Sequence, residues 1–220
     1  MRIGVMGTGM VGKAIATRLV ELGHDVRMGS RSASNEAAEA WAAEHGERAT
    51  NGDFADTAAF GELVFNCTSG QGTLAALEQA GADNLAGKVL VDVANPLDWS
   101  TGELRLTVCN TDSLGEQVQR ALPRTRVVKA LNTMNCSVMV EPGLVAGDDH
   151  LVLMCGDDAT AKADVAALLG EFGWTTDRIV DLGGITAARG QEMFLPLWVE
   201  LMRARGSATF NLAIRGAGPA

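Results

Sequence analysis

The sequence predicts an α/β protein with a doubly wound, mostly parallel sheet and a C-terminal helical extension. Short apolar runs alternate with Ala-rich stretches of helical periodicity along most of the 220 residues, which is the pattern of repeated βα units. The apolar runs are continuous, as in parallel strands that are covered on both faces. The first run leads directly into Gly7-Thr8-Gly9-Met10-Val11-Gly12, a glycine-rich turn between a strand and a helix.

The strands and helices follow one another in order. We expect Gly23 at the C-terminal end of the first helix and Ser34 as the N-cap of the second. Pro196 lies inside the last helical stretch and predicts a kink or a restart there. The apolar runs predict strands at 3–6, 24–28, 48–50, 63–67, 89–93, 127–131, 151–155 and 178–180. The helical stretches are 11–22, 35–45, 53–60, one ending near 80, 113–122, 159–172 and 185–203.

The glycines of the first turn predict a bound dinucleotide. Gly7 permits a tight turn out of the strand, Gly9 lets backbone N–H groups approach a pyrophosphate, and Gly12 lets the helix pack closely. The residues between the glycines belong to the same binding turn: Thr8, Met10 and Val11.

The end of the second strand predicts which dinucleotide is bound. An NAD site usually has an acidic residue about 20 residues after the glycines, where it binds the ribose 2'-hydroxyl. Here that stretch reads Gly29-Ser30-Arg31, and no Asp or Glu occurs between Asp25 and Glu36. A hydroxyl and a guanidinium are suited to a 2'-phosphate. The sequence therefore predicts NADP(H).

Small polar residues also follow three later strands. Ligands of open α/β sheets bind outside the carboxyl ends of the strands, where the strand order reverses. Loops at 68–72, 95–96 and 132–135 should leave that edge, although each loop is also compatible with ordinary turn chemistry. From these loops we expect cofactor contacts from Thr68, Ser69, Asn95 and Asn132.

The sequence offers no certain catalytic acid or base. The chain has no Tyr, and its three histidines, His24, His45 and His150, precede strands or end a helix, so we place them away from the carboxyl edge. Lys129 lies inside an apolar strand, where pairing with a carboxylate or a backbone carbonyl is favoured over catalysis. We therefore expect hydride transfer that depends on the positioning of two rings.

Composition excludes several classes of protein. The formal net charge of -9 argues against nucleic acid or an anionic membrane surface as the main partner. The four cysteines form no C-x-x-C pair, so we expect neither a metal site nor a redox pair. With no secretory leader and no apolar run of about 18 residues, the protein is expected in the cytoplasm.

Three motifs together resemble the NADP oxidoreductases that depend on coenzyme F420, a deazaflavin. They are the glycine turn, Gly29-Ser30-Arg31, and Val127-Val128-Lys129-Ala130-Leu131-Asn132-Thr133. The similarity extends to the reductase domains of the STEAP metalloreductases and covers essentially the whole chain. The family commonly adds a basic residue shortly after the arginine, and residues 32–35 contain none.

The resemblance implies reversible hydride transfer between the nicotinamide C4 and the deazaflavin C5, without a covalent protein intermediate. It places Ser30 and Arg31 at the 2'-phosphate and Thr8 on the phosphate side. It also implies a homodimer. The partner is then a small-molecule redox acceptor, and we place its pocket at Pro96, Thr133, Met134, Met193 and Trp198.

Two other functions stay open. A reductase of imines or pyrroline carboxylates has a similar N-terminal fingerprint, but it usually carries a long helical dimerisation domain. A sensor would bind NADPH without turnover. In either case we expect a Rossmann-like NADP-binding domain over 1–182 and a loose tail over 216–220. Between them, a helix within 183–215 would pack on the sheet, cover the cofactor pocket or form a dimer interface.

Overall fold

The strands form one eight-stranded sheet in the computed structural model, which describes residues 1–147 and 149–216. Their order is β10-β9-β8-β5-β4-β1-β2-β3. The strands from β8 to β3 are parallel, whereas β9 runs antiparallel to β8 and β10 runs parallel to β9. The bounds are β1 (Arg2–Met6), β2 (Asp25–Ser30), β3 (Ala49–Asp53), β4 (Leu63–Asn66), β5 (Val89–Asp92), β8 (Arg126–Ala130), β9 (Val152–Cys155) and β10 (Ile179–Asp181). The predicted doubly wound, mostly parallel sheet is confirmed.

The strand order reverses at β1. The chain builds β2 and β3 on one side of β1, then crosses back to build β4, β5 and β8 on the other. Met6, the last residue of β1, is in register with Gly29 of β2 and Asn66 of β4. The turns that follow these three strands therefore leave the same edge, at the point where open sheets bind ligands.

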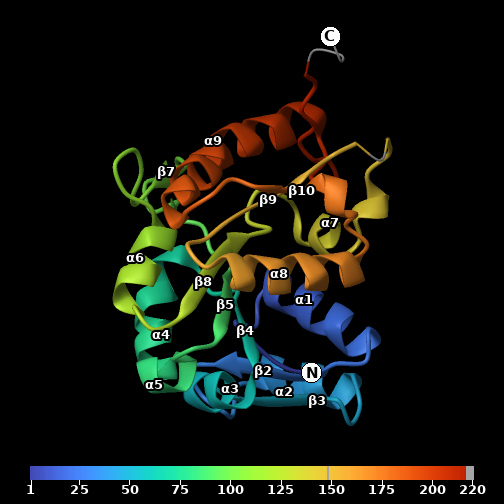
Figure 1. The fold of residues 1–220 in the computed structure, drawn as a ribbon. Helices are drawn as coiled ribbons and strands as arrows, with labels where there is room; N and C mark the ends of the chain where they lie inside the picture. Colours follow the sequence, from blue (N-terminus) through green and yellow to red (C-terminus); the bar gives the residue numbers. More distant parts are fainter. Residues whose placement is uncertain (148, 217–220) are drawn as a thin grey trace.

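Helices cover both faces of the sheet (Figure 1). Along β4, Leu63 and Phe65 point into one core cluster and Val64 points into the other, which is the alternation of a strand buried on both sides. The first face packs against α1 (Met10–Glu21), α2 (Glu36–Glu44), α7 (Cys136–Val140) and α8 (Ala159–Phe172). The second packs against α3 (Phe54–Phe60), α4 (Thr73–Ala80), α5 (Ala82–Leu85) and α6 (Leu114–Ala121).

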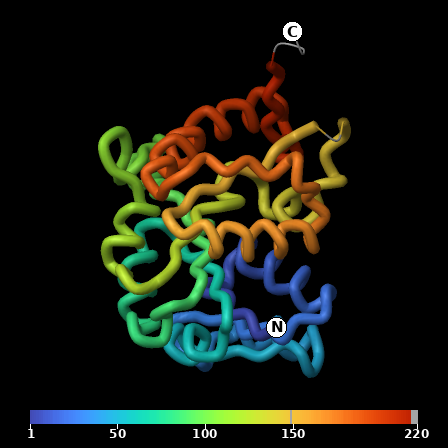
Figure 2. Tube along the Cα trace, in the orientation of Figure 1, coloured from blue at the N-terminus to red at the C-terminus, as the bar shows by residue number. Residues whose placement is uncertain are grey.

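The last helix, α9 (Ala188–Arg205), lies at the opposite end of the molecule from β2 and β3 (Figure 1, Figure 2). It continues through Pro196 as one helix, so the expected restart is wrong. After α9 the chain turns back, and the Leu212 carbonyl accepts a hydrogen bond from Leu151 N at 2.9 Å. The predicted helical extension is thus a helix followed by a non-helical segment. Of the predicted tail, all but Gly216 lies outside the described residues.

Several local features differ from the prediction. The N-cap of α2 is Asn35 rather than Ser34, because the Asn35 side chain accepts a hydrogen bond from Ala38 N at 3.1 Å. A small hairpin of β6 (Leu97–Asp98) and β7 (Arg105–Leu106) was not predicted. Short elements also escaped prediction: α5, α7 and the 3-10 turns η1 (Gly70–Gly72), η2 (Pro142–Leu144) and η3 (Thr176–Arg178). The predicted helical stretch from 185 begins as the 3-10 turn η4 (Ile185–Ala187). Among the helices described, none has the length and apolar character needed to cross a membrane.

Candidate functional site

The three glycines of the first turn have different surroundings. Gly7 has a φ of +120°, and a Cβ on it would lie 2.5 Å from the Cys67 carbonyl oxygen. A Cβ on Gly12 would lie 2.0 Å from the Gly7 carbonyl oxygen. A Cβ on Gly9 would meet nothing within 4 Å. Gly7 and Gly12 are therefore required by packing, whereas Gly9 borders open space at the start of α1, where backbone N–H groups are available to an anion.

A cavity of about 740 Å³ occupies the predicted crevice. Seven of the predicted cofactor residues line it: Gly7, Thr8, Gly9, Ser30, Arg31, Thr68 and Ser69. They come from the turns after β1, β2 and β4, which the strand order makes neighbours. The lining also includes residues that the sequence did not suggest: Ser32, Asn35, Phe54, Cys67, Gly72, Ala75, Ala76 and Gln79.

One end of the cavity is suited to an anion. The Ser30 hydroxyl donates to the Ser32 carbonyl at 2.6 Å and accepts from Ser32 N at 3.2 Å, which fixes the turn after β2. Arg31 is exposed and, within the described part of the chain, has no ion-pair or hydrogen-bond partner. The other nearby arginines are engaged, because Arg27 lies over the Phe60 ring at 4.6 Å and Arg18 pairs with Glu21 at 3.2 Å. Arg31 is thus the guanidinium available to a ligand.

Other predicted cofactor residues have a structural role or lie outside the cavity. Gly29 packs against α3, since a Cβ there would lie 2.5 Å from Thr57 Oγ1. Val11 packs against the apolar core, while Met10 is 81% exposed at the start of α1. Gly29 therefore has a packing role, and its contact with the cofactor stays a prediction.

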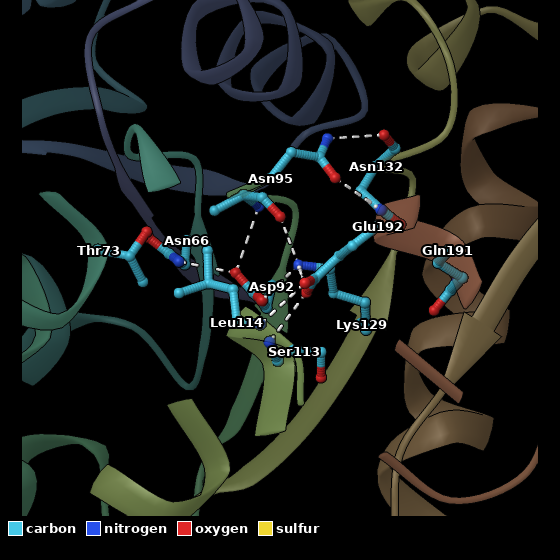
Figure 3. Close-up of polar contacts among 12 residues, drawn as sticks. Asn66, Thr73, Asp92, Asn95, Ser113, Leu114, Lys129, Asn132, Gln191 and Glu192 are labelled. Carbon is cyan, nitrogen blue, oxygen red and sulfur yellow. Dashed lines mark hydrogen bonds and ion pairs between the residues drawn. The ribbon is translucent and has the colours of Figure 1, made fainter. Parts of the chain in front are cut away.

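Asn95 and Asn132 join two of the carboxyl-edge loops to each other (Figure 3). Asn95 Nδ2 donates to the Asn132 carbonyl at 2.8 Å, and Asn132 Nδ2 donates to Asn95 Oδ1 at 2.9 Å. These bonds leave Asn132 Oδ1 buried without a partner among the described residues. Neither asparagine is among the described residues that line the cavity, and their contact with the cofactor stays a prediction.

The backbone before Asn132 is strained. Leu131 is fully buried and has a φ of +66°, a conformation that L-residues other than Gly, Asn and Asp seldom adopt. Such a residue costs about 1–3 kcal/mol and persists only where the surrounding structure holds it. Leu131 is the first residue after β8, and the polar loop begins at the next residue, Asn132.

A buried charge cluster lies beneath these loops and consists of Asp92, Lys129 and Glu192 (Figure 3). Lys129 Nζ lies 2.8 Å from Asp92 Oδ2 and 2.9 Å from Glu192 Oε1, and the three side chains are at most 1% exposed. Lys129 Nζ also donates to the Ala94 carbonyl. Burial disfavours the charged ammonium, but the attraction of both carboxylates outweighs it and holds the pKa of Lys129 above its ordinary value. The two carboxylates therefore favour the protonated form of Lys129.

No other side chain at this edge is poised for acid, base or nucleophilic chemistry among the described residues. Burial and the charge of Asp92 raise the pKa of the Cys67 thiol, and burial raises that of Cys155 to about 12. His150 lies two residues before the antiparallel strand β9 and so lies toward the carboxyl edge, contrary to expectation. Its ring donates to the Pro142 carbonyl at 3.1 Å and accepts from Asn211 at 3.0 Å. Both ring nitrogens are thus already engaged.

The five residues predicted for the acceptor pocket come from three segments: the loop after β5, the turn after β8, and α9. Thr133 and Met134 are buried, and Met134 belongs to the apolar core. Their place in an acceptor pocket stays a prediction. Pro96 lies against Gly70, Met193 is exposed on α9, and Trp198 stacks on Phe210 with 5.3 Å between ring centroids. None of the five is among the described residues that line the cavity. No cluster with metal-ligating potential occurs in the described ranges.

Comparisons with known proteins agree on the family. Residues 2–96 match the family model described as NADP oxidoreductase coenzyme F420-dependent. An F420-dependent NADP reductase of Methanothermobacter marburgensis is 30% identical over 216 residues, which cover 91% of this chain and 92% of that protein. The metalloreductase STEAP3 of Rattus norvegicus is 31% identical over 205 residues, but the chain spans only 38% of its length.

A solved structure gives the same result. A protein from Arthrobacter sp. FB24, provisionally assigned as an F420-dependent NADP reductase, is 50% identical, with a TM-score of 0.92 over 98% of this chain and 100% of that one. Imine reductases are more distant, at no more than 20% identity, and share the fold alone. The chain is therefore an NADP-dependent oxidoreductase and belongs to the family of F420-dependent NADP oxidoreductases.

Proposed function

We propose that the protein transfers hydride between NADP(H), bound along the cavity after β1, β2 and β4, and coenzyme F420. The observation that carries the assignment of the NADP(H) end is the unpaired Arg31 guanidinium beside the hydroxyl-rich turn of Ser30 and Ser32. A 2'-phosphate carries two negative charges and several acceptor oxygens, which match these donors. Gly9 leaves room for the pyrophosphate at the N-terminus of α1.

The carboxyl-edge loops support the nicotinamide end of this proposal. When bound, the cofactor would supply a hydride from its nicotinamide C4. The deazaflavin would accept the hydride at C5 and a proton from solvent on a ring nitrogen. Thr68, Asn95 and Asn132 surround the edge where the ring would lie, and the buried Asn132 Oδ1 offers an acceptor to a carboxamide N–H. Raised pKa values hold the proton on both Lys129 and Cys67, so in this proposal the protein contributes orientation and exclusion of water.

Substitution of Arg31 tests the cofactor assignment. In Arg31→Ala we expect NADPH to bind roughly tenfold or more weakly, because charge-assisted hydrogen bonds worth about 1.5–3 kcal/mol each are removed. NADH, which lacks the 2'-phosphate, should bind as before. Isothermal titration calorimetry with both nucleotides measures the difference.

Arg48→Ala is the matched control, because Arg48 pairs with Asp25 at 2.9 Å on the surface, away from the cavity. It should leave both affinities unchanged. Equal affinity of the unmutated protein for NADH and NADPH would contradict the assignment of the 2'-phosphate site.

The acceptor is tested by following NADPH absorbance with F420, free flavins and cyclic imines. Rapid oxidation with F420 supports the proposal. Oxidation with cyclic imines alone would identify an imine reductase, and tight NADPH binding without oxidation by any acceptor would identify a sensor. Either of these results rejects F420 as the substrate.

The proposal includes a homodimer in the cytoplasm, with residues 1–182 as the NADP-binding unit and α9 at the subunit interface. Met193, Leu197 and Leu201 are spaced four residues apart on α9 and are 38%, 56% and 38% exposed. This spacing places them on one side of the helix as an apolar stripe. A second copy of the chain would bury that stripe.

A further inference from the structure

The buried charge cluster of Asp92, Lys129 and Glu192 is a costly feature for a protein core. Its members come from β5, β8 and α9, and none is more than 1% exposed. Removing charges from water carries a penalty that their mutual attraction often fails to offset, and apolar replacements of such groups are frequently no less stable. Stability alone therefore gives little reason for this cluster, and its contacts point to a different role.

The charges of the cluster are balanced by a helix. Two carboxylates face one ammonium, which leaves one buried negative charge in excess. The Glu192 carboxylate accepts from Leu114 N at 2.8 Å and Gly115 N at 2.9 Å, the first two N–H groups of α6. The positive end of the helix dipole compensates the second carboxylate. Glu192 thus ties α9 both to α6 and to Lys129.

The cluster also reaches the loops at the carboxyl edge (Figure 3). Lys129 donates to the Ala94 carbonyl while Asp92 Oδ1 accepts from Ala94 N at 3.3 Å, so the cluster binds both backbone polar groups of Ala94, the residue before Asn95. Asp92 Oδ1 also accepts from Asn66 Nδ2 at 2.7 Å, and Asn66 Oδ1 accepts from the Thr68 hydroxyl at 2.7 Å.

The third loop is connected through the asparagine pair. Asn95 follows Ala94, whose backbone binds the cluster, and it forms two hydrogen bonds with Asn132. Asn132 follows the strained Leu131, whose left-handed conformation needs a rigid surrounding structure. All three loops at the carboxyl edge therefore depend on one set of buried contacts. Arg31, at the other end of the cavity, follows β2. Among the described residues, neither Arg31 nor Ser30 takes part in the hydrogen bonds and ion pairs of the charge cluster.

We propose that Lys129 and Asp92 are positioning residues for the nicotinamide ring, and that Glu192 connects these two residues to α9. The proposal rests on the proposed function, since it assumes that the nicotinamide lies at these loops. It divides the site into two parts: the turn with Arg31 binds the adenosine 2'-phosphate half, and the cluster orients the half that reacts.

The test compares two ligands in one variant. Lys129→Met alone would leave the buried Asp92 carboxylate without a cation, so the variant is Asp92→Asn/Lys129→Met. It keeps an amide oxygen for Asn66 and Ala94 and leaves Glu192 on the α6 N-terminus. Calorimetry measures binding of NADPH and of adenosine 2',5'-bisphosphate, which lacks nicotinamide. We expect NADPH to bind roughly tenfold more weakly while the bisphosphate changes less than about twofold. Single-turnover hydride transfer to F420 should fall on the order of tenfold to a hundredfold.

A matched control is Lys162→Met/Asp181→Asn, which removes an ion pair of 2.7 Å between α8 and β10 in the same chemical way. It should change neither affinity. Glu192→Gln, which keeps the Lys129–Asp92 pair, should weaken NADPH selectively by a smaller factor, and an unchanged affinity would remove α9 from the proposal.

Two results overturn the positioning role of the cluster. Equal loss of affinity for both ligands would indicate general disruption, and no loss for NADPH would show that the cluster does not act on the nicotinamide. A failure of the proposed function is different, because the unmutated protein would then bind neither NADPH nor the bisphosphate.

Discussion

At the residue scale, the glycines of the first turn make separable contributions to folding and to binding. Gly12 contacts the backbone of Gly7, whereas Gly9 faces open space. The G-x-G-x-x-G pattern marks both positions in the same way, and only the distances around each Cα distinguish them.

We predict opposite phenotypes for alanine at these two positions. In Gly12→Ala the new methyl would lie 2.0 Å from the Gly7 carbonyl oxygen, so the free energy of unfolding should fall by about 1–3 kcal/mol or more. In Gly9→Ala stability should change by less than about 0.5 kcal/mol, because Gly9 has ordinary backbone angles at the N-cap, but NADPH binding should weaken.

Urea unfolding and NADPH titration of both variants check this prediction. Gly23→Ala is unsuitable as a control because Gly23 has a φ of +88°. Gly143→Ala serves better, since a Cβ there meets nothing within 4 Å and the position is remote from the turn. A stable Gly12→Ala, or a Gly9→Ala that binds NADPH normally, would contradict the assigned roles.

At the scale of elements, α9 has two faces with different chemistry. One face carries Glu192 into the buried charge cluster and also includes the buried Leu195 and Val199. The other carries the exposed stripe of Met193, Leu197 and Leu201. The inner face of α9 is held by an ion pair, and its outer face is apolar and exposed. Such a helix is suited to connect the site of one subunit to a neighbouring subunit.

We therefore predict that the protein sediments as a homodimer and that Leu197→Asp converts it to a monomer. A carboxylate in the middle of the apolar stripe would be buried without a partner in the dimer. Sedimentation velocity measures the change. Leu144→Asp, at a leucine that is 46% exposed on η2, is the control and should remain dimeric. A monomeric unmutated protein would disprove the homodimer.

At the scale of the whole molecule, α6 and α9 are also joined by the ion pair of Glu116 and Arg189, which makes the free energy of unfolding depend on pH. Arg189 donates to both oxygens of Glu116, at 2.7 and 2.9 Å, and Ser113 donates at 2.7 Å. These hydrogen bonds, chiefly those of Arg189, hold the pKa of Glu116 below its ordinary value. The resulting stability is present above the unfolded-state pKa and is lost as the pH falls through the lower folded-state pKa.

Unfolding by urea should reveal this dependence. Between about pH 6 and about pH 3, we expect the unmutated protein to lose more stability than Glu116→Gln, which has no carboxylate to protonate. Glu200→Gln, which breaks an exposed pair with Arg203, should behave like the unmutated protein. Parallel pH profiles for Glu116→Gln and the unmutated protein would rule out the contribution.

Much of the fold and part of the site were predictable because their signals are local. The strand and helix patterns and the turn with Ser30 and Arg31 each lie within a few residues of chain, and a prediction that Lys129 pairs with a carboxylate or carbonyl is confirmed. The antiparallel direction of β9 was not predictable from its apolar run, because strand direction depends on the connection that precedes it. That direction moved His150 to the opposite edge from the one expected.

The sequence by itself determined the doubly wound fold and predicted the NADP(H) end of the site, because the glycine turn and the turn with Ser30 and Arg31 each lie within a few residues of chain. Only the tertiary structure decided which loops act together. Asp92, Lys129 and Glu192 meet because β5 and β8 are neighbours and α9 docks on the N-terminus of α6. Such contacts depend on strand order and on helix docking, which bring together residues that are far apart in the chain. Their buried charges then compensate one another.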